Sequence, residues 1–454
     1  MKSPFLLFAS LAVATPVAVI MAQQPPTPPS QQTGEIGVRL SGDPGTPPRL
    51  AVPDFLALSN DRETQEIART IAEVLWADLQ YEREFYMIPR DTYKSIPAAA
   101  AIGEPPLDRW RELGADGVVM GSVTKQGDAV RVEMRLFSVS RRQQIYAREY
   151  GGSAANPRLY AHTISDELHM SQRNLRGVAR TKLTFVSDRD RERVKNTIEK
   201  RDVKEVYTSD YDGSNQRRIT ISWQLNNSPT WSPDGRSIAY TSWRTGFPDI
   251  YISRIYEGII SNPAKGTART QNYLPMFSPD GTKLAFMSQR DGNSEIYVMN
   301  VDGSGLRRLT NHPAIDVTPT WSPSGTQVAF TSERGGTPSI YIVDADGLSA
   351  PRRVTFENSD RATWSPPPRN EIAYCARTGP GYDIKVLNLA SNETRQLTFG
   401  EGTNESPAWA SNGRHLAFTS TRAGLAQIFT VDYDGQNLRQ ITRAGNNQQA
   451  NWSQ

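Results

Sequence analysis

The sequence predicts a small α/β N-terminal domain followed by a six-bladed all-β propeller whose C-terminal strand pairs with the first blade. Three observations favour this fold. An aromatic-led motif returns every 43 to 46 residues, short β-rich runs separated by Asp-Gly turns follow the internal copies, and the repeats at both ends of the series are incomplete. A period of roughly 40–50 residues is typical of propeller blades and of helical repeats. The runs are too short for helical periodicity, so each repeat is predicted to form four antiparallel strands.

The repeated motif is clearest at residues 231–235, where it is Trp-Ser-Pro-Asp-Gly. Its aromatic position recurs at Phe277, Trp321, Trp364, Trp409 and Trp452. We expect each ring to pack between neighbouring blades, where it would bury roughly 150–250 Å² of surface. Later Asp-Gly pairs, at Asp212, Asp302, Asp346 and Asp434, are predicted to form type I′ turns. They resemble fragments of calcium loops, but such loops need more oxygen ligands and a terminal Glu.

The two ends of the repeat series complement each other. Residues 181–221 contain the later strands of a blade without a preceding motif, and the chain ends shortly after Trp452-Ser453. We therefore predict that the C-terminal strand is the innermost strand of the first blade. This pairing would close the ring formed by residues 181–454 and remove its open sheet edges.

Residues 49–172 are predicted to form the α/β domain, and residues 173–180 a linker to the propeller. A helix is expected at residues 63–81, because Ile67, Ile71, Val74, Leu75 and Leu79 form one apolar stripe. Asn156-Pro157 begins a second helix, to about residue 170, with the proline in its first turn. Strands are expected at residues 50–55, 85–88, 117–120, 129–137 and 145–150, and a short helix at 110–113.

The N-terminal segment is predicted to direct export of the chain. Residues 1–22 combine Lys2, apolar runs and an abrupt polar boundary, as in a signal peptide. Residues 23–48 are rich in Pro and are predicted to be flexible, either as a passive spacer or as a peptide that docks on a partner. Cys375 is the single cysteine, so no internal disulfide is expected.

The composition and motifs exclude several function classes. With 51 basic and 48 acidic residues and a net charge of +3, the chain has no overall charge suited to nucleic acid or an anionic membrane. It has no nucleophile elbow, phosphate-binding loop or Cys–His pair, since Cys375 lies within a predicted strand. Neither catalytic residues nor a cofactor are therefore predicted.

One histidine-containing helix face needs separate consideration. His162, Asp166 and His169 share a face of the second predicted helix, where a metal site and packing or capping at the helix surface are the alternatives. The chain has four histidines and no Cys or His cluster that completes a ligand set. We therefore expect packing or capping and no metal.

Two sets of residues are predicted to lie on one rim of the propeller. An arginine follows the second strand of every blade, at Arg189, Arg244, Arg290, Arg334, Arg377 and Arg422. We favour a structural role, in which each arginine ties neighbouring loops together through charged hydrogen bonds, over a binding role. The loops that lead into the innermost strands vary from blade to blade, and we expect a recognition surface there. Its candidate residues are Asn226, Gln271, Asn272, Tyr273, Leu274, Asp316, Val317, Thr318, Asn404 and Glu405.

With these features, the chain resembles the TolB family, the periplasmic propeller proteins of the Tol–Pal envelope system. The N-terminal domain carries the similarity at residues 50–55 (Leu-Ala-Val-Pro-Asp-Phe), from Trp110 through 114–122, at 158–166 and at 180–182 (Arg-Thr-Lys). These markers follow the family's order, and the resemblance covers residues 49–454.

The resemblance implies a non-enzymatic periplasmic scaffold. In the family, the propeller rim docks a peptidoglycan-associated lipoprotein near the central channel, and the mature N-terminal segment engages TolA. Such a scaffold is peripheral to the outer membrane through its partners and supports envelope integrity and outer-membrane constriction in cell division. By position, the family's contact loops correspond to residues 271–274 and 316–318. We expect a monomer. The alternatives are a small-ligand or glycan-binding propeller, and a relative of prolyl-oligopeptidase-type hydrolases without its catalytic domain.

Overall fold

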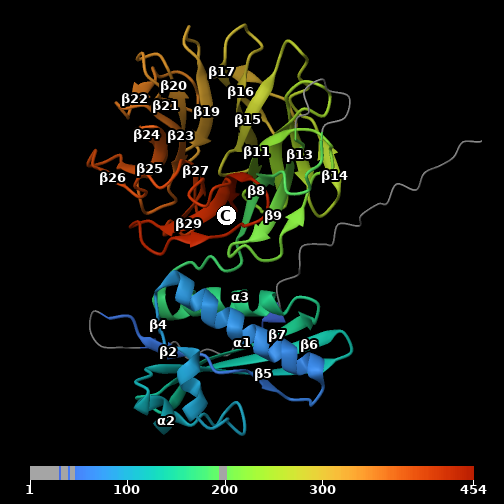
Figure 1. Cartoon of the computed structure of the whole chain (residues 1–454), viewed down its shortest axis with the longest axis vertical. Helices are drawn as coiled ribbons and strands as arrows, with labels where there is room; N and C mark the ends of the chain where they lie inside the picture. Colours follow the sequence, from blue (N-terminus) through green and yellow to red (C-terminus); the bar gives the residue numbers. More distant parts are fainter. Residues whose placement is uncertain (1–29, 32–38, 41–45, 194–201) are drawn as a thin grey trace, which may run out of the picture.

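The computed structural model describes residues 30–31, 39–40, 46–193 and 202–454. These residues form one seven-stranded sheet with helices, and six four-stranded sheets arranged in a ring (Figure 1). The α/β domain and the six-bladed propeller predicted from the sequence are thus confirmed. The predicted signal peptide at residues 1–22 and most of the Pro-rich segment at 23–48 lie outside the described residues.

The α/β domain is built on one mixed sheet with the strand order β1-β7-β6-β5-β2-β4, and β3 pairs with β5. Strands β5, β6 and β7 form an antiparallel meander, whereas β2 runs parallel to β4 and β5. Its strands are β1 (Ser30–Gln31), β2 (Arg49–Ala51), β3 (Leu56–Ala57), β4 (Tyr86–Met87), β5 (Gly117–Gln126), β6 (Ala129–Ser138) and β7 (Gln143–Ser153). Its helices are α1 (Arg62–Glu82), α2 (Leu107–Glu112), α3 (Pro157–Leu168) and a 3-10 turn at Arg90–Ser95.

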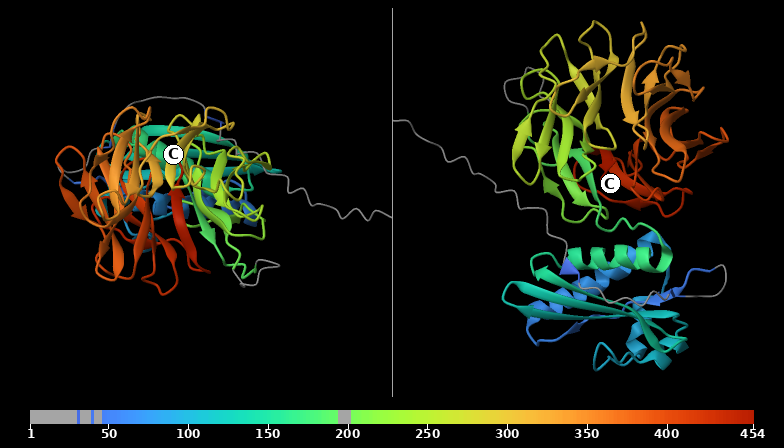
Figure 2. Two further views of the ribbon diagram at one scale, coloured as in Figure 1. Left: turned by 90° about the horizontal axis from the view of Figure 1, so that it is seen from above. Right: turned by 180° about the vertical axis from the view of Figure 1, so that it is seen from behind.

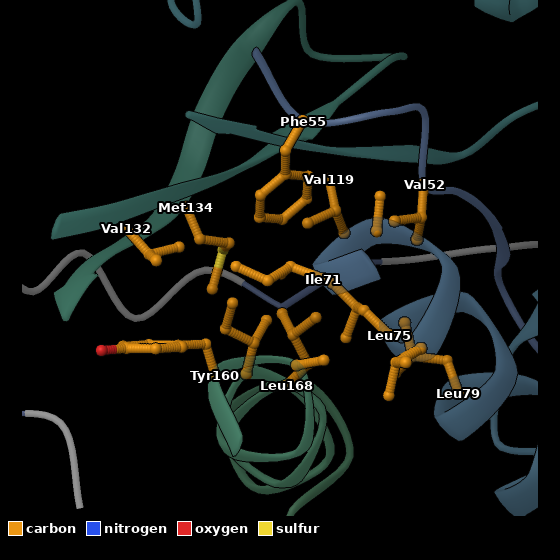
Figure 3. Packing of buried hydrophobic residues seen from close by; sticks show 14 of the residues in the cluster. Val52, Phe55, Ile71, Leu75, Leu79, Val119, Val132, Met134, Tyr160 and Leu168 are labelled. Carbon is orange, nitrogen blue, oxygen red and sulfur yellow. The ribbon is translucent and has the colours of Figure 1, made fainter. Parts of the chain in front are cut away.

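Helix α1 follows the sequence prediction closely. The Asp61 carboxylate accepts a hydrogen bond from the Thr64 N–H at 2.8 Å and caps the first turn. The helix ends where Arg83 adopts a left-handed conformation, with φ of 59°. The predicted apolar stripe is buried between the sheet and α3; Figure 3 shows Ile71, Leu75 and Leu79 of this stripe.

The strands differ from the prediction at their ends, and the strand expected at residues 50–55 spans only Arg49–Ala51. Strand β5 was expected to end at residue 120 but continues to Gln126, because β6 pairs with it along its whole length. The partly exposed residues Thr124 and Lys125 carry no apolar signal, so the sequence pattern underestimates the strand. Helix α3 ends at Leu168, and one π-helical turn at His169–Arg173 completes the predicted segment.

Each blade of the propeller has four antiparallel strands, as predicted. Blade one contains β31 (Asn447–Trp452), β8 (Lys182–Ser187), β9 (Glu205–Asp210) and β10 (Arg217–Arg218). Blade two contains β11 (Asn226–Trp231), β12 (Ser237–Ser242), β13 (Asp249–Arg254) and β14 (Ile259–Ser261). Blade three contains β15 (Asn272–Phe277), β16 (Lys283–Ser288), β17 (Glu295–Asn300) and β18 (Arg307–Arg308).

The remaining three blades repeat this order from the innermost strand outward. Blade four contains β19 (Asp316–Trp321), β20 (Gln327–Ser332), β21 (Ser339–Asp344) and β22 (Arg352–Arg353). Blade five contains β23 (Ser359–Trp364), β24 (Glu371–Thr378), β25 (Gly381–Asn388) and β26 (Thr394–Gln396). Blade six contains β27 (Asn404–Trp409), β28 (His415–Ser420), β29 (Gln427–Asp432) and β30 (Arg439–Gln440).

The C-terminal strand closes the ring. Strand β31 pairs antiparallel with β8, with Asn447 opposite Ser187 and Trp452 opposite Leu183. The Trp452 indole N–H donates to the Thr181 hydroxyl at 2.7 Å. The prediction that the C-terminal strand is the innermost strand of blade one is therefore confirmed.

The repeated aromatic residues pack between blades, as expected. Trp231 lies in a cluster with Val206 of blade one and Ile238 of its own blade, and Trp321 bridges blades three and four in the same way. Trp364 departs from this pattern, because its side chain is only partly buried.

The Asp-Gly turns have a different geometry from the predicted type I′. In blade three, the Gly303 N–H donates to the Asn300 carbonyl, and Gly303 alone among the turn residues has positive φ, at 91°. This is a type I turn followed by a glycine in the left-handed region, a three-residue hairpin loop. The Asp302 carboxylate accepts the Ser304 N–H at 2.8 Å, so the aspartate closes its own turn.

Each propeller rim has distinct neighbours. The Asp-Gly rim consists of the turns between first and second and between third and fourth strands; the arginine rim, on the opposite side, consists of all other loops. The α/β domain packs on the Asp-Gly rim at blades one and six, where Arg158 pairs with Asp212 and Arg83 with Asp432. Figure 2 shows the chain's C-terminal end on the side of the ring next to this domain.

The three helix residues considered for a metal site lie at this interdomain interface rather than at a helix surface. His162 and His169 are buried, and Asp166 is partly buried. His162 pairs with Asp78, Asp166 accepts the backbone N–H groups of Ala179 and Arg180, and His169 contacts the Ser165 carbonyl. The expected surface packing is thus corrected to interdomain packing. Within the described ranges, no group of three or more His, Cys, Asp or Glu is arranged to hold a metal ion.

Candidate functional site

The six innermost strands share one local geometry where they begin on the arginine rim. In each, the first residue is buried, the next two are partly exposed, and the third has a positive φ between 50° and 58°. These third residues are Ser228, Leu274, Thr318, Arg361, Ser406 and Gln449. Each strand also shifts register at this point, which identifies a β-bulge. The bulges turn six equivalent side chains toward the central channel.

Neighbouring blades supply acceptors for the backbone N–H groups that the bulges free. The Leu274 N–H donates to the Thr241 hydroxyl of the preceding blade at 3.0 Å, and the Gln449 N–H donates to Thr419 at 2.9 Å. At the equivalent place, the Ser406 N–H donates to the Cys375 sulfur at 3.2 Å. These three bulges are thus fixed by contacts between blades.

The channel mouth within these bulges is narrow. A cavity of about 100 Å³ is lined by the six bulge residues and by the Pro, Ala, Thr, Met and Asn side chains that follow them. Arg361 is the charged residue of this lining and lies 3.7 Å from the carboxylate of Asp360. The Thr318 hydroxyl contacts the same carboxylate at 3.0 Å. Apart from Arg361, the surface thus presents uncharged polar and apolar groups.

Four of the six predicted rim arginines bind the first residue of their blade's innermost strand. The clearest case is Arg334, whose guanidinium lies 2.7 Å from the buried Asp316 carboxylate and also donates to the Ser332 hydroxyl. The other three pairs are Arg189 with Asn447, Arg290 with Asn272 and Arg422 with Asn404. The same four arginines lie over the aromatic residues of their blades. Their geometry matches the structural role favoured from the sequence.

The remaining two arginines have different surroundings. Arg377 is exposed and donates only a long hydrogen bond of 3.4 Å to the Gly379 carbonyl. By strand register, its blade has Ala376 and Ser359 at the positions where the others have serine and asparagine or aspartate, and Arg377 follows Ala376 directly. Arg244 lies 6.0 Å from the Tyr251 ring, and Asn226 in its blade is bound by Glu205 instead. The arginine is therefore present in all six blades, but it binds the first residue of the innermost strand in only four of them.

The structure divides the predicted contact residues into two groups. Four of them are the first residues of innermost strands and are fully buried, namely Asn226, Asn272, Asp316 and Asn404. The prediction that these four side chains contact a partner directly is wrong, because they are enclosed within the blade. The other six are partly exposed near the channel mouth, namely Gln271, Tyr273, Leu274, Val317, Thr318 and Glu405.

Sequence reasoning missed a set of exposed apolar side chains on the arginine rim. They lie in loops between blades or between second and third strands, at Ile221, Trp223, Ile315, Phe356, Phe399 and Leu425. Phe356 and Phe399 are 79% and 74% exposed, and each follows a threonine that lies two residues beyond the fourth strand of its blade. That shared position after threonine is the signal that could have identified them. Large exposed apolar side chains on one rim are typical of an interaction surface.

The comparisons with known proteins agree with this architecture. The family model of the TolB beta propeller domain matches residues 172–454, and that of the TolB amino-terminal domain matches residues 37–145. The chain belongs to the TolB family. The resemblance proposed from the sequence is thereby confirmed.

Individual relatives extend the comparison to nearly the whole chain. The Tol-Pal system protein TolB of Bordetella avium is 34% identical over 430 residues, which is 94% of this chain and 90% of that protein. The TolB of Desulfosudis oleivorans is 33% identical over 210 residues, 46% of this chain and 45% of that protein. Several curated TolB relatives are thus matched over only about half of their length. The crystal structure of TolB from Acinetobacter baumannii superposes with a TM-score of 0.76 and 25% identity, over 90% of this chain and 97% of that one.

Proposed function

We propose that this TolB-family protein is a non-enzymatic periplasmic scaffold of the Tol–Pal system that binds the peptidoglycan-associated lipoprotein through its arginine rim. The observation that supports this most is the asymmetry of the two rims. The α/β domain packs on the Asp-Gly rim, whereas in the described part of the chain the arginine rim combines exposed apolar residues with a rigid channel mouth. A partner of the propeller therefore has a preformed surface on the arginine rim.

The composition of the arginine rim suits protein recognition. Interfaces are enriched in aromatic anchors surrounded by polar groups, and a standard interface buries about 1,600 Å² in total. Tyr273 provides such an anchor beside the channel, since its ring packs edge-on against Trp243 and its hydroxyl donates to the Gln271 side chain. Tyr273 is therefore held in place before any partner arrives.

The side chains at the channel mouth also favour binding over catalysis. Uncharged polar and apolar residues predominate there, and they supply shape and hydrogen bonds rather than acid–base or nucleophilic chemistry. Burial raises the pKa of the Cys375 thiol, which keeps it protonated and poorly nucleophilic. None of the helices in the described residues is long and apolar enough to cross a membrane.

The proposal extends to the inner-membrane side of the system through the N-terminal segment. We infer that residues 23–48 engage TolA, as the family resemblance implies, so that the scaffold connects two partners during envelope constriction. Most of that segment lies outside the described residues, but β1 pairs with β7, which places its residues 30–31 on the α/β domain. Both partners would then bind away from the interdomain interface.

Titration calorimetry with the organism's own soluble peptidoglycan-associated lipoprotein domain tests the lipoprotein proposal. We expect binding, and we expect Tyr273→Ala and Phe399→Ala each to weaken it tenfold or more, about 1.4 kcal/mol, because both remove aromatic contact area. Leu348→Ala is the matched control, since Leu348 is 88% exposed in a turn of the Asp-Gly rim. Absence of binding by the wild-type protein at tens of micromolar would overturn the proposal, and equal losses in all three variants would move the site off the arginine rim.

A further inference from the structure

Helix α1 presents two buried carboxylates to two different blades of the propeller. Asp78 and Glu82 lie one helical turn apart, so both side chains project from the same face of α1. They are 1% and 5% exposed. Such buried acids are stable only where partners satisfy them, and their partners identify what the helix holds.

Asp78 binds blade one. The Tyr211 hydroxyl, in the turn that follows β9, donates to one oxygen of Asp78 at 2.7 Å. The other oxygen lies 2.7 Å from Nδ1 of His162 on α3, whose Nε2 is 3.8 Å from the Asp210 carboxylate at the end of β9. Blade one is thus joined to α1 directly and through α3.

Glu82 binds blade six. One of its oxygens pairs with the Arg414 guanidinium and accepts the Asn412 amide at 3.2 Å, both in the turn that leads into β28. The other oxygen accepts the backbone N–H of Val178 in the interdomain linker at 2.7 Å. The next residue, Arg83, pairs with Asp432 at the end of β29 at 2.7 Å.

Blades one and six meet at the seam of the ring. Blades two to six are each built from one continuous segment, whereas blade one takes β31 from the far end of the chain. One apolar cluster spans this seam and includes Tyr81 of α1, Tyr211 of blade one, Ile428 of blade six and Trp452 of β31. The Tyr81 ring lies 4.6 Å from that of His415 in blade six and 4.9 Å from that of Tyr211.

We propose that helix α1 is a clasp across the propeller seam, with Asp78 holding blade one and Glu82 holding blade six. Because both carboxylates belong to one helix, the two blades cannot separate unless the buried contacts of Asp78 or those of Glu82 are broken. Breaking the contacts of either carboxylate leaves a buried charge without a partner, which is strongly unfavourable. Docking of the α/β domain and closure of the ring are therefore one cooperative unit. This inference is independent of any lipoprotein partner.

Hydrogen exchange of the full-length protein, followed by mass spectrometry, tests the clasp. We expect Glu82→Gln and Asp78→Asn each to accelerate amide exchange in β31 and β8 tenfold or more, while β16 and β17 on the opposite side of the ring keep the wild-type rate. Glu73→Gln is the matched control, because Glu73 is exposed on α1 and pairs only loosely with Arg69 at 3.7 Å. It should leave all four strands unchanged.

Two outcomes would overturn the clasp. One is wild-type exchange in β31 and β8 in both variants, and the other is an equal acceleration in β16 and β17, which would show uniform destabilisation. If an acid variant fails to fold, Tyr211→Phe replaces it, since this change keeps the ring packing and removes the hydrogen bond to Asp78. We expect a several-fold acceleration confined to β31 and β8, and unchanged exchange in that variant would refute the proposed contact with blade one.

Discussion

At the residue scale, Arg334 and Arg377 both belong to the predicted set of rim arginines but have different energetic roles. We expect Arg334→Ala to lower the free energy of unfolding by about 3 kcal/mol, because it leaves the fully buried Asp316 carboxylate without its cation. Burial already raises the pKa of Asp316, so the carboxyl should take up a proton when Arg334 is absent. Urea unfolding monitored by tryptophan fluorescence measures the change.

The control for this experiment is Arg377→Ala. Arg377 is exposed and its hydrogen bond is long, so its removal should alter the free energy of unfolding by less than about 0.5 kcal/mol. Equal losses in the two variants would show that the pair with Asp316 contributes nothing beyond a surface arginine.

Side-chain direction explains why sequence reasoning placed the arginines better than the contact residues. The Ser-x-Arg spacing is a local pattern, and it predicted a structural tie that four blades show. Asn272 and Asp316 were expected at the surface because they stand in variable loops. Each lies just before a β-bulge, where the strand turns its first side chain into the blade, and no sequence pattern states that direction.

At the scale of the strand, the backbone N–H of a β-bulge donates to one side chain of the preceding blade in three of the bulges. Cys375 supplies the acceptor for the Ser406 N–H, and threonine does so at the equivalent positions 241 and 419. We therefore expect Cys375→Thr to change the free energy of unfolding by less than about 0.5 kcal/mol. Cys375→Val, whose side chain has nearly the same shape as threonine, should cost about 1 kcal/mol, because it leaves the partly buried Ser406 N–H without its acceptor.

Urea midpoints of the two Cys375 variants, measured side by side, provide the check. Because both variants lack the sulfur atom, the difference between their midpoints reports only the presence or absence of the hydroxyl acceptor. If valine proved as stable as threonine, the Ser406 bulge would have to obtain its hydrogen bond elsewhere.

The elements with strong periodicity were predicted best. Helix α1 was expected at residues 63–81 and spans Arg62–Glu82, since its apolar stripe and its cap are both local signals. The turns were predicted as type I′ from their Asp-Gly pairs, but in each pair φ is positive at the glycine and not at the aspartate. Dipeptide identity alone does not distinguish a two-residue loop from a three-residue loop, which depends on the register of the flanking strands.

At the scale of the whole molecule, the placement of the α/β domain could not be predicted. Asp78 and Glu82 carry no signal in the sequence beyond ordinary polar residues of an amphipathic helix, and His162 was considered only for a metal site or for helix packing. Only the fold brings them to blades one and six, which are distant from them in the chain. The ring closure was predictable because the incomplete first and last repeats state it directly.

The interdomain interface should make the free energy of unfolding fall as the pH becomes alkaline. Burial alone would lower the pKa of His162, but the carboxylates of Asp78 and Asp210 outweigh it and raise the pKa from 6.5 to about 9. Tyr211 and Lys182 also face these two carboxylates. The native state therefore holds this proton more tightly than the unfolded chain. Its stabilising effect, about 3 kcal/mol, is complete below pH 6.5 and is lost as the pH rises through 9.

Urea unfolding between pH 7.5 and 10 measures this effect. Asp166 interferes little, because burial raises its pKa to about 7, which lies below this window. We expect the free energy of unfolding to fall across this window in the wild type. The fall should be smaller in His162→Gln, which lacks the titrating imidazole. An identical slope in both proteins would assign the pH dependence to other groups.

Deletion of residues 451–454 tests whether the last strand holds the whole ring. Trp452 is buried in the seam cluster, and the Ser453 hydroxyl accepts the Lys182 N–H at 2.9 Å. Their loss should cost at least 3–5 kcal/mol, as for a buried tryptophan, and should lower Tm by roughly 10 °C. Deletion of the exposed Gln454 alone is the control and should leave the melting curve unchanged. Because α1 spans the same seam, the longer deletion should also accelerate exchange at the interdomain interface, whereas an unaltered melting curve would mean that other contacts close the ring.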